Sequence, residues 1–207
     1  MASSTKPNAD TLLELIKGRR SYYALSKDLS ISKDRIQEIV KEAILQVPSS
    51  FNSQSNRVIV LFGDEHDKFW SIVRETLQAF GTPETREKTN SRLAMFDASA
   101  GTILFFEDQT VVENFQSKFA IYADRFPGWA QQSDAMLQFA LWTALEAEGL
   151  GANLQHYNPI VDDKVAAAWN VPSTWKLNAQ LVFGGRAGEV GPKEQIPIED
   201  RLKVYGA

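Results

Sequence analysis

The sequence predicts a mixed α+β or α/β sandwich in which strands alternate with helices along a chain of 207 residues. Three short runs rich in β-branched and aromatic residues are typical of buried strands, and they lie at residues 57–62, 102–106 and 177–183. Segments with apolar residues at helical spacing separate these runs. Because both kinds of element interleave over the whole length, we expect one domain over residues 10–207, after a flexible start at residues 1–9.

Two helices are expected before the first strand. Thr11-Leu-Leu-Glu14 has the form of a capping box and predicts a short helix from about Thr11 to Lys17, which Gly18 ends. Ser32 suits the N-cap of a second helix, whose apolar residues share one face until Pro48. Both helices therefore carry an apolar stripe.

Helices are also expected after each of the first two strands. Asp64 is placed to cap a helix that closes at Gly81, and residues 84–97 form another. A helix from about Thr110 to Tyr122 follows the second strand. The acids of Asp64-Glu65-His66-Asp67 suit a helix start, where negative charge favours the macrodipole, better than they suit a metal site.

Residues 133–149 form the most apolar predicted helix. Its apolar residues, which occupy nearly every face, are Met136, Leu137, Phe139, Ala140, Leu141, Trp142, Ala144, Leu145 and Ala147. A helix of this kind must be covered by protein on most sides. In a chain of this length, a partner subunit is a natural source of that cover.

The C-terminal third is expected to contain a short strand at 152–155, a short helix at 165–169 and the strand at 177–183. The tail at 185–207 is rich in glycine, proline and charge. Leu202 and Val204 alternate with charged neighbours, as in a half-buried strand. A long stretch without regular structure usually wraps another surface or belongs to a site.

Composition excludes several classes of function. There is no cysteine and there are only two histidines, which excludes disulfides, iron–sulfur clusters and cysteine zinc sites and predicts no metal centre. A net charge of −4 provides no overall basic footprint for nucleic acid. No apolar run approaches the roughly 20 residues of a membrane helix. We therefore expect neither a nucleic-acid nor a membrane partner, and a reducing compartment, the cytoplasm or the nucleus, fits best.

Three polar segments carry side chains that suit a ligand. Arg19-Arg20-Ser21 could supply charge-assisted hydrogen bonds to a phosphate, or it could be a solvated basic helix end. Residues 48–54 could present amides and hydroxyls to a polar heterocycle, or they could be a hydrophilic connection. Residues 149–159 place glycines before aromatic and amide side chains, which suits close ligand approach or, alternatively, a helix C-cap followed by a strand.

Taken together and in this order, these segments resemble the nitroreductase family of FMN-dependent flavoproteins. Arg19-Arg20-Ser21 matches the family's Arg-Arg-Ser near the first helix, and Pro48-Ser-Ser-Phe-Asn-Ser-Gln54 matches its Pro-Ser-Ser-x-Asn-x-Gln loop. Gly149-Leu-Gly151 matches the Gly-Leu-Gly after its central helix. The strand at 101–106 and Leu154-Gln-His-Tyr-Asn-Pro159 look like the subgroup of the fungal fatty-acid-repression protein and its small bacterial relatives. The similarity covers roughly residues 10–205.

The resemblance implies a nitroreductase-like sandwich with a central, mostly antiparallel sheet flanked by helices. It also implies a homodimer with two FMN sites at the interface and a C-terminal extension that wraps the partner. The implied FMN-binding residues are Arg19, Arg20 and Ser21 at the phosphate, Ser49, Ser50, Asn52 and Gln54 from the other subunit, and Leu154, Gln155 and His156 at the flavin N5 edge. Many members of the family also close the phosphate site with a Lys-x-Arg pair in the C-terminal tail. Here Lys193 keeps one basic group, and Arg186 is a candidate for the other.

The function implied by the resemblance is a ping-pong oxidoreductase, in which NADH or NADPH reduces FMN and a nitroaromatic or quinone takes the electrons. His156 is a candidate proton donor, with a positioning or packing role as the alternative. A second hypothesis is a flavin-binding regulatory protein in lipid signalling or the oxidative-stress response, with incidental redox turnover. A third is an interaction module without a cofactor.

Overall fold

The computed structural model of the protein describes residues 8–80 and 82–207. Within these residues the strands form a five-stranded sheet of order β1-β5-β3-β2, and β4 also pairs with β5. All ladders between strands are antiparallel. The strands are β1 (Leu25–Ser26), β2 (Asn56–Phe62), β3 (Gly101–Asp108), β4 (Gly151–Gln155) and β5 (Trp175–Arg186). The predicted α+β class with a central antiparallel sheet is confirmed.

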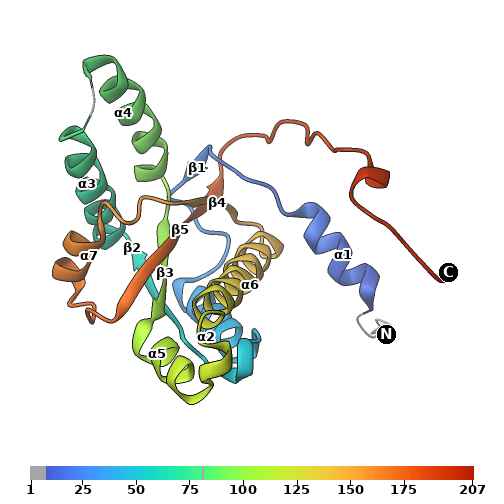
Figure 1. The fold of residues 1–207 in the computed structure, drawn as a ribbon. Coiled ribbons are helices and arrows are strands. Elements are labelled where there is room, and N and C mark those ends of the chain that lie inside the picture. The colour runs from blue at the N-terminus through green and yellow to red at the C-terminus, as the bar shows by residue number, and fades with distance from the viewer. Residues whose placement is uncertain (1–7, 81) are drawn as a thin grey trace.

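Helices cover both faces of the sheet (Figure 1). They are α1 (Ala9–Gly18), α2 (Lys33–Gln46), α3 (Asp64–Gln78), α4 (Pro83–Asp97), α5 (Gln109–Lys118), α6 (Phe126–Ala147) and α7 (Asp162–Trp169). Three 3₁₀ turns are η1 (Ser50–Asn52), η2 (Ala120–Tyr122) and η3 (Ile198–Asp200). No helix in the ranges 8–80 and 82–207 combines the length and apolar character needed to cross a membrane.

Alternation along the central strands builds two separate apolar cores. On β3, Ile103 and Phe105 pack in a cluster with residues of α2 and α6. Leu104 and Phe106 point the other way, into a cluster with residues of α3, α4 and α7. Successive side chains of a strand point to opposite faces, so a run that is apolar at every position must be covered on both sides. This explains why the strand at 102–106 reads as continuously apolar.

Helix α1 and the C-terminal tail extend away from the sheet on the same side of the molecule (Figure 1). Leu12, Leu13 and Leu15 are exposed on α1, which has no buried residue. The tail likewise exposes Ile196, Leu202 and other large apolar side chains. Exposed apolar side chains gathered on two neighbouring segments are typical of an interaction surface.

Two predicted helix starts are wrong. Helix α1 begins at Ala9 because the side chain of Asn8 accepts a hydrogen bond from Thr11 N at 3.1 Å, so Asn8, not Thr11, is the N-cap. Residues 8 and 9 of the expected flexible start therefore belong to α1 and its cap, and residues 1–7 lie outside the described part. Gly63, with φ 55°, is the N-cap of α3, and Asp64 is the first residue inside that helix. The expected helix end at Gly81 also lies outside the described residues.

Three other predicted elements differ from the structure. The helix expected over 110–122 ends at Lys118 and is followed by the 3₁₀ turn η2. The helix expected over 133–149 starts earlier, at Phe126, where Pro127 is preorganised for the first turn and Phe126 packs beside Val112. The strand expected around Leu202 does not form, and the described tail contains only the 3₁₀ turn η3.

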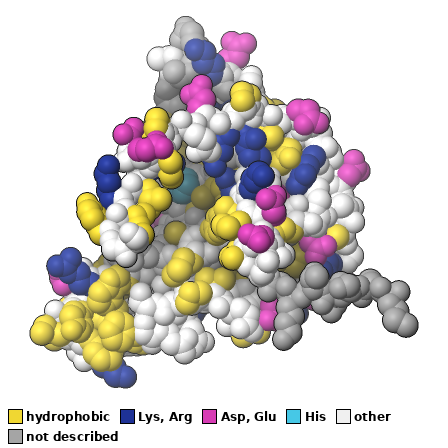
Figure 2. Space-filling model, turned by 90° about the vertical axis from the view of Figure 1, so that its right-hand side faces the viewer, with side chains coloured by type: hydrophobic (Ala, Val, Ile, Leu, Met, Phe, Trp, Pro, Cys, Tyr) yellow, Lys and Arg dark blue, Asp and Glu magenta, His cyan; other side chains and the backbone are white. Residues whose placement is uncertain are grey.

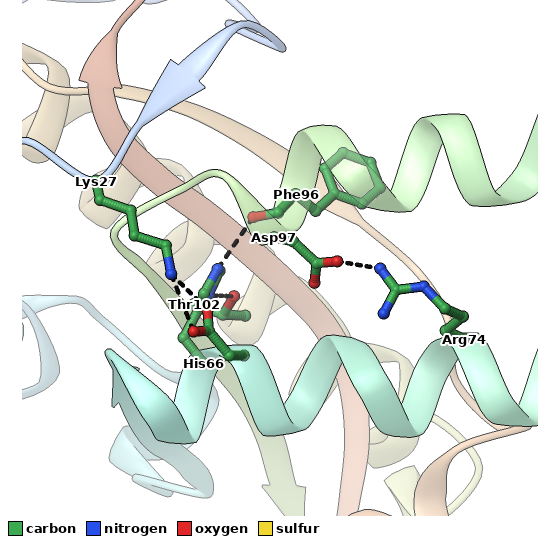
Figure 3. Close-up of polar contacts among 7 residues, drawn as sticks. Lys27, His66, Arg74, Phe96, Asp97 and Thr102 are labelled. Carbon is green, nitrogen blue, oxygen red and sulfur yellow. Dashed lines mark hydrogen bonds and ion pairs between the residues drawn. The ribbon is translucent and has the colours of Figure 1, made fainter.

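A buried hydrogen-bond chain ties α3 to the sheet (Figure 3). His66 Nε2 lies 3.0 Å from Phe96 O, which can only accept, so Nε2 carries the hydrogen. His66 Nδ1 therefore accepts from Thr102 Oγ1 at 2.8 Å, and that oxygen accepts from Trp70 Nε1 at 3.0 Å. Burial lowers the pKa of His66, so the neutral ring is favoured.

The acids around His66 act as expected for a helix start. Asp64, Glu65 and Asp67 lie in the first turn of α3, where negative charge is favoured. Asp67 also pairs with Lys27 at 2.9 Å. Across the part of the chain described by the structure, no group of three or more histidine or acidic side chains is arranged to hold a metal ion.

Candidate functional site

A basic hollow lies where the end of α1 meets the C-terminal tail. It has a volume of about 670 Å³. Its lining includes Arg19, Arg20 and Ser21 from the segment after α1, and Lys193 with Glu189 and Glu194 from the tail. Figure 2 shows the molecule from this side, with lysine and arginine side chains gathered beside hydrophobic ones. The structure thus brings together four of the residues predicted to bind a phosphate.

The guanidinium of Arg19 contacts an aromatic ring, but one of its nitrogens has no hydrogen-bond acceptor among the described residues. Its Cζ lies 4.3 Å from the centroid of the Trp142 ring, in a cation–π contact. Its Nη1 is buried and has no hydrogen-bond partner among the described residues. A buried donor without an acceptor is costly, so this atom suits an anionic ligand.

Glu146 is a buried carboxylate beneath this segment, and the sequence analysis missed it. Its Oε2 accepts from the backbone N–H of Arg20 at 2.9 Å, and its Oε1 accepts from Trp142 Nε1 at 2.7 Å. Burial raises the pKa of Glu146, while these two hydrogen bonds act in the opposite direction. The signal that could have revealed it is an acid in the otherwise apolar stretch before Gly149.

Arg186 has contacts that differ from the predicted phosphate role. Its Nε donates to Leu150 O and its Nη2 donates to Glu146 O, both at 3.0 Å. Its guanidinium also lies over the Tyr22 ring, 4.6 Å from the centroid. Arg186 does not line the hollow and instead satisfies carbonyls at the end of α6, where a cation is favoured. Of the two predicted tail cations, Lys193 lines the hollow and Arg186 does not.

Strand β4 runs directly beside the basic segment. Ser21 forms an isolated parallel bridge with Ala152, and Tyr22 N donates to Ala152 O at 2.9 Å. A Cβ on Gly151 would lie 2.9 Å from Tyr22 Cβ, so a larger residue would push away the chain that follows Ser21. The approach of the two segments therefore depends on glycine at position 151.

The predicted N5-edge residues follow on the same strand. Leu154 and Gln155 are half-buried on β4, and His156 is exposed just after it. No side-chain hydrogen bond holds His156 to another described residue. These three residues follow Ala152, which pairs with Ser21, along the same chain segment.

The predicted polar loop has a well-defined conformation of its own. Ser49 Oγ accepts from Gln54 N at 2.9 Å, and Ser50 N donates to Ser133 Oγ at 3.2 Å. Phe51, Asn52 and Gln54 all have positive φ, which side chains adopt at some cost. The loop is thus held in a strained shape at the start of β2.

The loop and the basic segment lie at opposite ends of the sheet. The start of β2, at Asn56, is paired through Glu107 with the start of β5. Gly151, beside the basic segment, is paired with Gly184 near the other end of β5. At about 3.3 Å per residue, the strands separate the two regions by roughly 20 Å or more. A single chain therefore does not bring Ser49, Ser50, Asn52 and Gln54 to the basic hollow.

The antiparallel sheet, its two helical layers and the site along β4 define an α+β protein of the nitroreductase type. Comparison with known proteins gives the same result. The model of the nitroreductase family matches residues 16–185, and the chain belongs to this family of oxidoreductases.

Two yeast relatives are similar to this protein over most of its length. The Saccharomyces cerevisiae protein HBN1 is 37% identical over 188 residues, which is 90% of this chain and 93% of HBN1. Nitroreductase FRM2 of the same yeast is 35% identical over 195 residues, covering 93% and 96% of the two chains. These matches confirm the predicted family and its fungal subgroup.

Solved structures confirm the fold. Nitroreductase CinD from Lactococcus lactis, in complex with nicotinic acid, is 44% identical with a TM-score of 0.88, and the match covers 94% of this chain and all of that one. CinD has also been solved with chloramphenicol and with 4-nitrophenol. A Desulfovibrio desulfuricans protein in complex with FMN shares the fold at 18% identity, with a TM-score of 0.70 and coverage of 97% and 99%.

Proposed function

We propose that this chain is an FMN-dependent oxidoreductase that uses NADH or NADPH to reduce nitroaromatic compounds or quinones. The observation that carries the proposal is the buried, unpartnered Nη1 of Arg19 beside Arg20, Ser21 and Lys193. Two guanidiniums, a hydroxyl and an ammonium form a donor set suited to a phosphate dianion. The nitroaromatic complexes of its relative CinD support the choice of acceptor.

The residues present fit FMN. Arg19, Arg20, Ser21 and Lys193 would hold its phosphate, and the half-buried Leu154 and Gln155 of β4 would lie along its ring system. When bound, FMN supplies the chemistry by carrying two electrons from the nicotinamide to the acceptor. The protein binds, orients and shields the reactants. His156 is exposed at the end of β4 and could hold a proton for the product.

The site is proposed to be completed by a second copy of the chain. Ser49, Ser50, Asn52 and Gln54 lie at the far end of the sheet, so they reach a basic hollow only across a dimer interface. The exposed leucines of α1 and the exposed apolar residues of the tail offer the surface that such a partner would cover. The expected mass in solution is therefore that of a homodimer, which light scattering on a sizing column measures.

The test of the phosphate assignment is the double variant Arg19→Ala with Arg20→Ala. Apo-protein prepared by dialysis is titrated with FMN, and the loss of flavin fluorescence reports binding. Removal of two charge-assisted contacts is expected to weaken FMN binding by about 100-fold or more. Arg86→Ala with Arg125→Ala removes two exposed arginines outside the hollow and is the matched control. Unchanged FMN affinity in the first double variant would refute the proposed site.

A further inference from the structure

We propose that Glu146 is a positioning residue for the phosphate-binding segment Arg19–Ser21, and that it strengthens anion binding although it carries negative charge. The inference rests on the proposed function and deepens it. It concerns a residue on α6 that does not line the hollow. Glu146 therefore acts through the two arginines above it.

The Glu146 carboxylate fixes the positions of both Arg19 and Arg20. Oε2 of Glu146 holds the backbone N–H of Arg20 at 2.9 Å, which fixes the course of the main chain after α1. Oε1 holds Trp142 Nε1 at 2.7 Å, and the Trp142 ring in turn lies 4.3 Å from the guanidinium of Arg19. The Arg20 contact spans 126 residues of sequence, so it is a tertiary anchor between α6 and the segment after α1.

The chemistry of the contacts requires a carboxylate. Both partners are donors, and an ionised carboxylate can only accept, so both of its oxygens are used. A glutamine of the same size has one oxygen and one NH₂ group. In Glu146→Gln, the NH₂ group must face either Arg20 N–H or Trp142 Nε1–H, donor against donor. The side chain of Glu146 is 3% exposed, so water cannot easily repair the mismatch.

A positioning role and a purely electrostatic role for Glu146 predict opposite changes in anion affinity when its charge is removed. Its carboxylate lies 4.0 Å from Arg186 Nη2 and interacts electrostatically with Arg19, in a site proposed to bind a dianion. If Glu146 mattered only through its charge, its neutralisation would tighten anion binding. If it positions the arginines, its neutralisation weakens anion binding. The sign of the change therefore separates the two roles.

The experiment compares FMN with riboflavin, which has the same ring system but no phosphate. Apo-protein of the wild type and of Glu146→Gln is titrated with each flavin. FMN binding is expected to weaken at least tenfold in the variant, while riboflavin binding stays within twofold. A loss confined to the phosphate-bearing ligand is a readout that a general folding defect would not produce.

Glu148→Gln is the matched control. Glu148 lies two residues further on and accepts from Arg35 Nε and Nη2 at 3.1 and 2.8 Å, away from the hollow. Its variant is expected to bind both flavins like the wild type. Trp142→Phe, which keeps an aromatic ring but removes the donor to Glu146, replaces Glu146→Gln if that variant does not fold. It is expected to show the same FMN-selective loss, severalfold in size.

The outcomes are distinguishable. FMN binding in Glu146→Gln that is equal to or tighter than that of the wild type overturns the positioning role. An equal loss of FMN and riboflavin also overturns it. A wild-type chain that binds neither flavin refutes the proposed function itself, and the role of Glu146 falls with it.

Discussion

Thr102 on β3 offers a direct test of the buried hydrogen-bond chain beneath α3. Its side chain is fully buried, and its hydroxyl both accepts from Trp70 Nε1 and donates to His66 Nδ1. Thr102→Val keeps the shape of the side chain and removes both hydrogen bonds. The variant therefore leaves one donor and one acceptor buried without a partner.

The expected cost follows from these two groups. Each unsatisfied buried polar group costs about 1–3 kcal/mol, and the added methyl group returns up to about 1 kcal/mol. The free energy of unfolding is thus expected to fall by about 1–6 kcal/mol. This is a large part of the 5–15 kcal/mol that is typical of a folded domain.

Thr143→Val is the matched control, because the Thr143 hydroxyl is buried and no described residue is its hydrogen-bond partner. The same substitution is expected to be neutral or slightly stabilising there. Urea unfolding at one fixed protein concentration gives the two free energies, and unchanged m-values show that only stability has changed. Equal losses in the two variants, or a loss below about 1 kcal/mol in Thr102→Val, would refute the reasoning.

Two further predictions concern a buried carboxyl group and a crowded glycine. Burial raises the pKa of Glu107 from 4.5 to about 7 in the folded state, so stability is lost as the pH rises through that range. Glu107→Gln is expected to be more stabilising at pH 8 than at pH 5 by on the order of 2 kcal/mol. Urea unfolding of the wild type and the variant at both pH values measures this effect, and an equal effect of the substitution at the two pH values would contradict the prediction. A Cβ on Gly184 would lie 2.3 Å from Ser26 O, so Gly184→Ala is expected to cost about 1–3 kcal/mol. Gly128→Ala, with open space around its Cβ, is expected to be neutral or stabilising, and similar thermal melts for the two glycine variants would rule out the crowding.

The strands were predictable because their pattern is local and unambiguous. Ile103, Leu104 and Phe105 are all fully buried, and a short β-branched and aromatic run of this kind fits few other elements. Helix ends were less predictable, because several nearby residues can serve as the cap. At α1, both Asn8 and Thr11 suit an N-cap, and the hydrogen bond made by Asn8 adds a turn to the helix.

The start of α6 was missed for a different reason. Phe126 belongs to the helix because it packs with Val112 and Ala130 in a small apolar cluster. Val112 lies on α5, so this packing depends on a second element. Helical periodicity within residues 133–149 contains no information about that contact.

The candidate site was partly predictable from the motifs that the sequence shares with the nitroreductase family. Arg19, Arg20, Ser21 and Lys193 were expected at one phosphate, and the structure places all four around one hollow. Arg186 does not line the hollow, and its guanidinium donates to backbone carbonyls of α6 and the turn after it. Two arginines in a sequence look alike until their acceptors are known.

By itself, the sequence determined the α+β class, the order of the main helices and strands, and the family of the protein. The order of elements follows from short-range patterns of apolar, capping and turn residues, whereas the family and its α+β class follow from the ordered set of family motifs. Only the tertiary structure decided that Glu146 anchors Arg20, and that the polar loop and the basic hollow lie at opposite ends of one sheet. The physical reason is that hydrogen bonds and strand register join residues far apart in the chain, where no local pattern records the partner.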